Sequence, residues 1–323
     1  MPRSEREFPV SAELERLLTL FAAGDRPPHP DTPTPAAAVV LVRDTAAGVQ
    51  LFVTRQSDVR GNVERNRWSF PTVELSASDL RRLPLAGWSP EKCAAQLGMS
   101  AGGRALGYFA AAARAALLTT GILLAEDLDG RVVTTADAPD WDDDRAELAD
   151  GQLSLPQLLD DRSLRFRPDL LHPWLRWINT PWQLRRFDTV FFVAALPHVQ
   201  ALEFRSRNDS WGGWMTPAEV LEATGPSASD HISVATRLVC EGLAEVPTVG
   251  AAMARVRDLR PVRPEIVRHD DAWWVTVRPP GEPSDREALR PHAPEEAEPD
   301  TDEDSVSLVG DDEEEPVVDE AGA

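Results

Sequence analysis

The pattern of apolar and polar positions predicts strands at the start of the chain's body and again near its middle. Residues 36–44 and 48–56 are two apolar runs separated by a short polar stretch, which predicts two paired strands joined by a turn. Residues 189–196 form a continuous apolar run of strand length, which is typical of a central strand covered on both faces. The chain therefore has the strands of a buried sheet.

The longest predicted helix lies between Arg104 and Glu126. Residues 110–118 are all Ala, Leu or Arg, which are strong helix formers, and neither Gly nor Pro interrupts them. Gly121 stands where a left-handed C-cap would end the helix, and an apolar run follows it. We expect a buried helix of about four turns.

Residues 1–35 are predicted to form an N-terminal extension, with a helix at 11–21 and a proline-rich linker after it. Ser11 could cap this helix. Its apolar residues recur at i, i+3, i+4 and i+7 and so share one stripe: Leu14, Leu17, Leu18 and Phe21. Two alternatives are open, because the stripe could pack back on the chain's own domain or could dock a protein partner.

Caps and turns predict the remaining elements. Thr216 and Glu219 have the spacing of a capping box, which predicts a helix directly after a short strand. The polar stretch 127–151 contains three consecutive aspartates, and we expect a solvated loop rather than a metal site there. The other predictions are a short helix beginning at Ser89, a helix or turn at 153–159, a helix at 231–243 with His231 at its start, a helix at 249–256 and a hairpin turning at Asp270 and Asp271.

Charge separates the C-terminal end from the rest of the chain. The formal net charge is −21 over 323 residues; from Glu282 to the end, seventeen acidic residues and two arginines give −15, which leaves −6 for the body. A body with that mild charge argues against a nucleic-acid binder. Residues 284–323 are expected to be a disordered acidic tail, which either keeps the protein in solution or docks a protein partner.

Cysteines and apolar runs bear on the cellular compartment. Cys93 and Cys240 are the only cysteines, too few for a disulfide framework or a cysteine-rich zinc site, so we expect two structural thiols. The N-terminus has no apolar core of signal-peptide length, and no window has the apolar length of a membrane span. We therefore expect a cytoplasmic protein with no membrane partner.

The end of the long predicted helix carries a motif with a known chemistry. The sequence RAALLTTGI, which begins at Arg114, resembles the end of the Nudix box, the signature of hydrolases that cleave nucleoside diphosphates linked to another group. Arg114 and Gly121 match the box. Its three glutamate positions hold Ala115, Leu118 and Thr119 instead.

In that family the three carboxylates share one helix face and bind Mg²⁺ or Mn²⁺. The metal neutralises the pyrophosphate, positions the attacking water and lowers its pKa. Ala115 and Leu118 offer no ligand, and Thr119 offers only a neutral hydroxyl. The resemblance therefore implies a Nudix fold that has lost its catalytic metal site, so we expect no catalytic residue and no cofactor.

A second motif precedes the helix. Residues 67–71, Arg-Trp-Ser-Phe-Pro, resemble the Trp-x-Phe-Pro-Gly-Gly entry to the box. Thr72 and Val73 replace the two glycines, which in the family let the backbone turn sharply near the substrate. Asp79 stands at the first acidic position of the box. An insertion at about residues 75–103 then separates the two halves of the motif.

The insertion and residues 168–197 resemble one branch of the family, the peroxisomal coenzyme A diphosphatases and their bacterial relatives. The shared letters include Pro-Trp-x-Arg-Trp-Ile-x-Thr-Pro and Arg-Phe-Asp-Thr. The resemblance covers about residues 36–283 and implies one Nudix-type domain, an α/β/α sandwich with a mixed central sheet. Arg55, Trp68 and Arg186 are the candidate residues for binding a nucleotide-like small molecule.

Three tryptophans in this segment leave two alternatives open. Trp174, Trp177 and Trp182 lie just before the apolar run at 189–196. Aromatic rings there could line a nucleotide pocket by stacking, or they could belong to the hydrophobic core.

The sequence supports two main hypotheses for function. In the first, the chain is a Nudix-fold protein that has lost metal-dependent pyrophosphohydrolase activity and binds a ligand or a protein partner. In the alternative, it is an active hydrolase of coenzyme A or nucleoside diphosphate derivatives, with Mg²⁺ or Mn²⁺ held by relocated acids such as Glu74, Asp79 and Glu126. The alternative requires those carboxylates to converge in the fold. A purely structural subunit is a third possibility.

Overall fold

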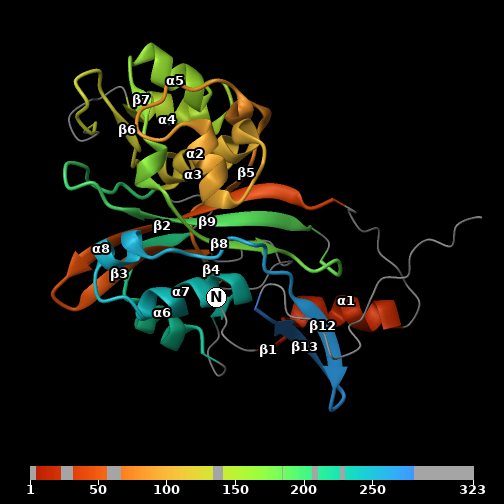
Figure 1. The fold of residues 1–323 in the computed structure, drawn as a ribbon. Helices are drawn as coiled ribbons and strands as arrows, with labels where there is room; N and C mark the ends of the chain where they lie inside the picture. The colour runs from red at the N-terminus through yellow and green to blue at the C-terminus, as the bar shows by residue number, and fades with distance from the viewer. Residues whose placement is uncertain are drawn as a thin grey trace, which may run out of the picture. The chain divides into compact units, whose positions relative to one another are not determined.

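Two long parallel strands form the middle of the structure, a computed structural model (Figure 1). Strand β2 (Thr34–Thr45) pairs with β9 (Phe187–Ala195), so that Ala38 lies beside Phe191 and Val40 beside Val193. Successive side chains of a strand point to opposite faces. In β2 and β9 both alternating sets are apolar and buried, so each face of the sheet carries its own hydrophobic core.

Six further strands complete the eight-stranded mixed sheet. Its main order is β11-β4-β3-β2-β9-β8, while β10 also pairs with β3 and β5 also pairs with β2. The β2–β9 and β11–β4 pairs are parallel and the others are antiparallel. The bounds are β3 (Gly48–Gln56), β4 (Arg67–Ser69), β5 (Thr72–Glu74), β8 (His172–Ile178), β10 (Trp211–Met215) and β11 (His231–Ile232).

The structure describes seven stretches of the chain. They are residues 5–22, 32–56, 67–133, 141–183, 185–205, 210–225 and 230–279. All of them belong to one compact unit. The predicted acidic tail, residues 284–323, therefore lies outside the described residues.

One face of the sheet is covered by the insertion, the long helix and the elements between residues 141 and 170. These are α2 (Pro90–Leu97), α3 (Gly102–Thr120), α4 (Trp141–Ala149) and α5 (Leu155–Asp161), with the 3₁₀ turns η1 (Ala77–Leu80) and η2 (Pro168–Leu170). A small antiparallel sheet of β6 (Ala125–Glu126) and β7 (Arg165–Phe166) lies with them. Apolar side chains of all four helices share one core with β2 and β9.

Helices α6 (Pro217–Ala223), α7 (Val234–Ala244) and α8 (Val249–Ala254) pack against the opposite face, which gives the sandwich its three layers (Figure 1). The same core includes α1 (Ala12–Ala22) and a second sheet of order β1-β13-β12. Its strands are β1 (Arg6–Pro9), β12 (Glu265–His269) and β13 (Ala272–Val277). Strand β1 was not predicted from the sequence.

Many of the predicted elements are confirmed. The predicted strands at 36–44 and 48–56 pair as an antiparallel hairpin, and the run at 189–196 is a strand paired on both sides. Gly121 ends α3 with a φ of 72°, the left-handed cap that its position predicts. Thr216 and Glu219 form the predicted capping box at the start of α6.

The polar stretch 127–151 was wrongly predicted as a loop, because residues 141–149 form α4. Its three aspartates lie in the first turn, where negative charge favours a helix. Asp144 accepts a hydrogen bond of 2.8 Å from Arg162. Arg145 and Leu148, three residues apart, form the buried face of α4. The acidic residues around them make this helical spacing hard to recognise in the sequence.

The helix predicted at 231–243 starts later than expected. His231 and Ile232 form strand β11, and α7 begins at Val234. Ser233 is the N-cap, since its hydroxyl accepts a hydrogen bond of 3.1 Å from the backbone N–H of Thr236. His231 is therefore not the start of the helix.

Helix α1 packs back on its own domain, one of the two alternatives left open by the sequence. Leu14 and Leu18 are buried in the core on this face of the sheet, and the ring centres of Phe21 and Trp182 lie 5.1 Å apart. Trp174, Trp177 and Trp182 are themselves buried in this core, as the packing alternative expects. No helix among the described residues combines the length and apolar character needed to cross a membrane.

Two leucines of α1 make a matched pair for testing this packing. Leu18 is fully buried, whereas Leu20 is 48% exposed two residues away. We expect Leu18→Ala to lower the free energy of unfolding by about 2–5 kcal/mol, because it leaves a cavity. Leu20→Ala should change it by less than about 0.5 kcal/mol. Urea denaturation measures both, and equal effects would show that α1 does not pack on the domain.

The two cysteines give a prediction about reactivity. Both are buried, and burial raises the pKa of each thiol to about 12. Because the thiolate is the reactive form, we expect neither Cys93 nor Cys240 to react with Ellman's reagent at pH 8 in the folded protein. Both should react after unfolding in guanidinium chloride. Release of thionitrobenzoate before unfolding would contradict the burial of at least one thiol.

Candidate functional site

The helix face that would carry the metal ligands of a Nudix box packs against the hydrophobic core rather than facing water. Ala115 has no solvent exposure and belongs to the core shared with the central sheet. Leu118 is half-buried and packs against the same core, and Thr119 is also half-buried. The three positions therefore offer two aliphatic side chains and one hydroxyl where the resemblance places carboxylates.

The C-terminal turn of α3 is covered by two other parts of the chain. Arg145 of α4 donates hydrogen bonds of 3.2 and 2.9 Å from Nε and Nη2 to the carbonyl of Leu118. The backbone N–H groups of Glu203 and Arg205 bond the carbonyls of Thr120 and Thr119 at 2.8 and 3.2 Å. These contacts satisfy carbonyls that a helix end leaves without partners. Side-chain and backbone groups of other segments therefore cover the C-terminal end of α3.

Arg114 and Asp79 join the two halves of the box across the insertion. The guanidinium holds the Asp79 carboxylate with two hydrogen bonds, Nε to Oδ1 at 3.0 Å and Nη2 to Oδ2 at 2.7 Å. It also donates to the carbonyl of Glu74 at 2.8 Å. The Asp79 side chain is fully buried, and the backbone N–H of Ser76 donates to it at 2.8 Å. This carboxylate is already saturated by protein donors.

The two other candidate acids are paired with different arginines. Glu74 forms an ion pair with Arg185 near the end of β5. Glu126, in the small β6–β7 sheet, pairs with Arg165 at 2.7 Å and with Arg167 at 2.6 Å. No cluster of three or more His, Cys, Asp or Glu side chains that could hold a metal ion occurs within the described stretches. The fold does not bring Glu74, Asp79 and Glu126 together as a metal site.

The segment in place of the family's two glycines is a strand. Thr72 and Val73 belong to β5 and pair with Ala38 and Ala37 of β2. The Thr72 hydroxyl bonds the carbonyl of Phe70 at 2.8 Å. A paired strand holds its backbone groups in the sheet, so this segment lacks the free, glycine-rich turn of the family motif.

Two of the three predicted ligand-binding residues, Arg55 and Trp68, lie together and both contact Asp230, which was not predicted from the sequence. Arg55 and Trp68 are register partners on β3 and β4. Asp230 accepts a hydrogen bond of 2.7 Å from the Trp68 indole N–H and forms an ion pair of 2.9 Å with Arg55. No local pattern marks Asp230, because only the β4–β11 pairing brings it to the other two residues.

Trp211 adds an exposed aromatic surface beside them. It lies opposite Arg55 in the β3–β10 pairing, and its ring centre is 5.6 Å from that of Trp68. The ring also lies against Gly213, where a Cβ atom would come within 2.4 Å of it. Trp211 remains 46% exposed. Arg55, Trp68 and Trp211 therefore form one group, called the aromatic patch below, in which Trp68 is buried and Arg55 and Trp211 provide the exposed surface.

The third predicted ligand-binding residue lies elsewhere. Arg186 immediately precedes β9 and donates a hydrogen bond of 3.0 Å to the carbonyl of Asn179. Burial and the charge of Arg263 lower its pKa. Asp188, two residues further along the chain, accepts two hydrogen bonds from Arg176, of 2.9 and 2.6 Å. The structure thus places Arg186 in the framework of the β8–β9 connection and away from the aromatic patch.

Comparisons with known proteins give a likeness in structure alone. Neither a protein-family model nor a curated protein sequence matches the chain. A crystal structure described as a NUDIX hydrolase from Alicyclobacillus acidocaldarius aligns with a TM-score of 0.57 and 23% identity, covering 70% of this chain and 97% of that one. Two structures of a C. elegans Ap4A hydrolase, one a binary complex, align with TM-scores of 0.32 and 0.27. Their identities are 8% and 9%, and they cover 64% and 59% of this chain and 93% and 86% of their own.

The alignment with the bacterial structure extends over nearly all of that chain, and the two share a mixed sheet between helical layers. At 23% identity the likeness concerns the fold. The predicted α/β/α sandwich with a mixed central sheet is confirmed, and the chain has the fold of a Nudix hydrolase.

Proposed function

We propose that this chain is a Nudix-fold protein without metal-dependent pyrophosphohydrolase activity, and that it acts by binding a nucleotide-like ligand or a protein partner. One observation carries the proposal: the helix face that would hold the metal is packed, with Ala115 fully buried and Leu118 packed against the core. Mg²⁺ and Mn²⁺ require several hard oxygen ligands at one place. This face supplies one hydroxyl.

The pairing of the remaining acids supports the same conclusion. Asp79 and Glu126 are buried carboxylates, each held by arginine. Moving Asp79 to a metal would remove the ion-pair partner of Arg114, and moving Glu126 would remove a partner from Arg165 and Arg167, which is costly for partly buried charges. Glu74 is the exposed acid of the three, and a single carboxylate is too few for a metal cluster of this kind.

The aromatic patch supports a binding role. Trp211 presents a large exposed ring, and planar ligands stack on such rings. Arg55 stands beside it with its guanidinium partly exposed, although Asp230 offsets part of its charge. A nucleotide-like ligand has a planar base and an anionic part, so both kinds of contact fit the patch.

The direct test is hydrolysis of a panel of coenzyme A and nucleoside diphosphate derivatives with Mg²⁺ or Mn²⁺. We expect no metal-dependent product from this 323-residue chain, because the box face offers no carboxylate to hold the metal. Turnover that requires Mg²⁺ and survives further purification would overturn the proposal. A search for the true ligand set would then begin at Glu74, Asp79 and Glu126.

A double variant shows whether the old site can still receive substrate. Leu118→Glu with Thr119→Glu restores two carboxylates at half-buried positions of the box face. Leu118→Gln with Thr119→Gln is the matched control, since it has nearly the same shape and no charge. Metal-dependent hydrolysis in the Glu pair alone would show that substrate still reaches α3.

Stability measurements test the packing of the box face itself. We expect Ala115→Glu to lower the free energy of unfolding by about 3 kcal/mol or more, because it buries a carboxyl group without a partner. Thr119→Glu, four residues along the same face and half-buried, should change it by less than about 1 kcal/mol. Urea denaturation distinguishes the two. Small and equal effects would mean that water reaches position 115, and the proposal would lose its main support.

A further inference from the structure

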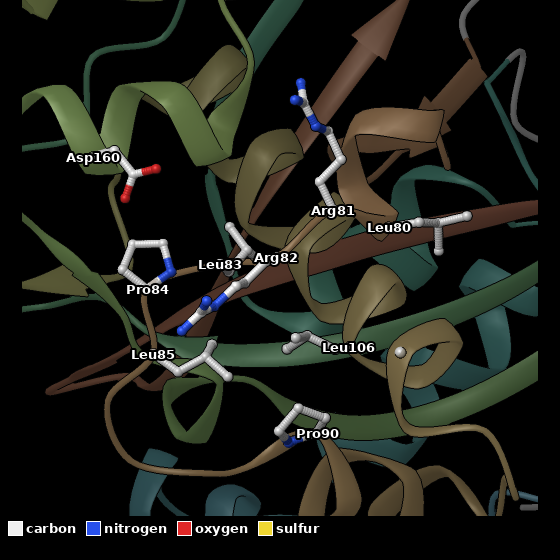
Figure 2. Close-up of a pocket in the computed structure, with 10 residues that line it drawn as sticks. Leu80, Arg81, Arg82, Leu83, Pro84, Leu85, Pro90, Leu106 and Asp160 are labelled. Carbon is white, nitrogen blue, oxygen red and sulfur yellow. The ribbon is translucent and has the colours of Figure 1, made fainter.

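The insertion that divides the box forms a cavity of its own, distinct from the box face (Figure 2). This insertion cavity has a volume of about 730 Å³. Cavities of roughly 300–1,000 Å³ are typical of small-molecule sites. It is lined by Leu80, Arg81, Arg82, Leu83, Pro84, Leu85, Pro90, Gly103, Leu106 and Asp160, from the segment after η1 and from α2, α3 and α5.

The lining is mostly aliphatic. Leu83 and Leu106 are 5% and 6% exposed and belong to the core beneath the helices, whereas Leu80 is 54% exposed. Figure 2 shows the leucines and prolines around the cavity. Aliphatic walls favour an apolar body, because a ligand that covers them removes apolar surface from water.

Two charged side chains of the lining have no partner of their own. Arg81 and Arg82 are exposed, and neither guanidinium forms an ion pair or hydrogen bond with any residue in the described stretches. Other arginines of this half of the domain behave differently, since Arg114 and Arg167 each hold carboxylates at 2.6–2.7 Å. Figure 2 shows the two guanidinium groups pointing apart, Arg82 toward Pro84 and Leu85 and Arg81 away from them. An unpaired cation beside an apolar cavity attracts an anionic group.

We propose that the insertion cavity binds a small amphipathic anion, with a carboxylate or phosphate head beside Arg82 and an aliphatic body against the leucines. The single acid of the lining, Asp160 on α5, reduces the positive charge there but does not cancel it. The site is independent of the box face, so it stands whether or not the protein hydrolyses a diphosphate.

Gly103 provides a way to close the cavity without disturbing its surroundings. A Cβ atom at this position would meet nothing within 4 Å, and the residue lies in the first turn of α3 with an ordinary backbone conformation. Gly103→Leu therefore extends a side chain from the cavity wall and also favours the helix. Gly250→Leu is the matched control, because Gly250 is an exposed glycine of α8 with similar open space.

The first experiment is isothermal titration of the full-length protein with octanoate and with octyl phosphate, below their micelle concentrations. We expect both octyl anions to bind. The difference between the affinities of octyl phosphate and octanoate shows which head group the cavity prefers. Inorganic phosphate and octyltrimethylammonium, which lack the apolar body or the negative charge, should bind at least about tenfold more weakly. Absence of binding by both octyl anions, or equal binding by either comparison compound, would overturn the proposal.

Variants then locate the bound anion. We expect Gly103→Leu, and separately Arg82→Gln, to weaken binding about tenfold or more. Asp160→Asn should strengthen it, because one opposing charge is removed. Gly250→Leu and Arg131→Gln, the latter at an exposed arginine elsewhere, should leave the affinity unchanged. Circular dichroism checks the fold of each variant, and unchanged affinity in a folded Gly103→Leu protein would place the anion outside the cavity.

Discussion

Close packing of α3 on β2 and β9 is the constraint on which the rest of the domain depends. The helix meets the sheet through small side chains, and the rings of Phe109 and Phe192 lie 4.7 Å apart between them. Packing at this density leaves no room for hydrated groups on the covered face. Ala115 lies on that covered face, and Arg145 covers the last turn of the helix.

The parts of the box that remain are those with a structural role. Arg114 and Asp79 tie the insertion to the helix, and Gly121 takes a left-handed conformation that ends it. A buried ion pair is costly to break on one side only, because the other charge is left unpaired. These residues therefore have a role in the fold itself. Their presence explains why the sequence resembles the Nudix box even though its glutamate positions are apolar or neutral.

Local patterns account for most of the fold and for little of the site. Apolar runs predicted β2, β3 and β9, and caps at Gly121 and Thr216 predicted two helix ends. The four-residue strand β1 was missed because it exists only through pairing with β13, more than two hundred residues away. Asp230 was missed for the same reason, since its bond to Trp68 depends on the parallel β4–β11 pairing. Long-range pairing decides both, and no short window of sequence contains it.

The insertion adds a cavity at the N-terminal end of α3, the end opposite the last turns that carry the box positions. Leu106 and Gly103 lie in the first turns of α3 beside the insertion cavity, whereas Ala115 and Thr119 lie in its last turns. The Arg114–Asp79 pair stands between the two ends and fixes the segment that leads into the cavity. The two ends of α3 pack against different neighbours, so a change in the side chains at one end can leave the cavity at the other end in place.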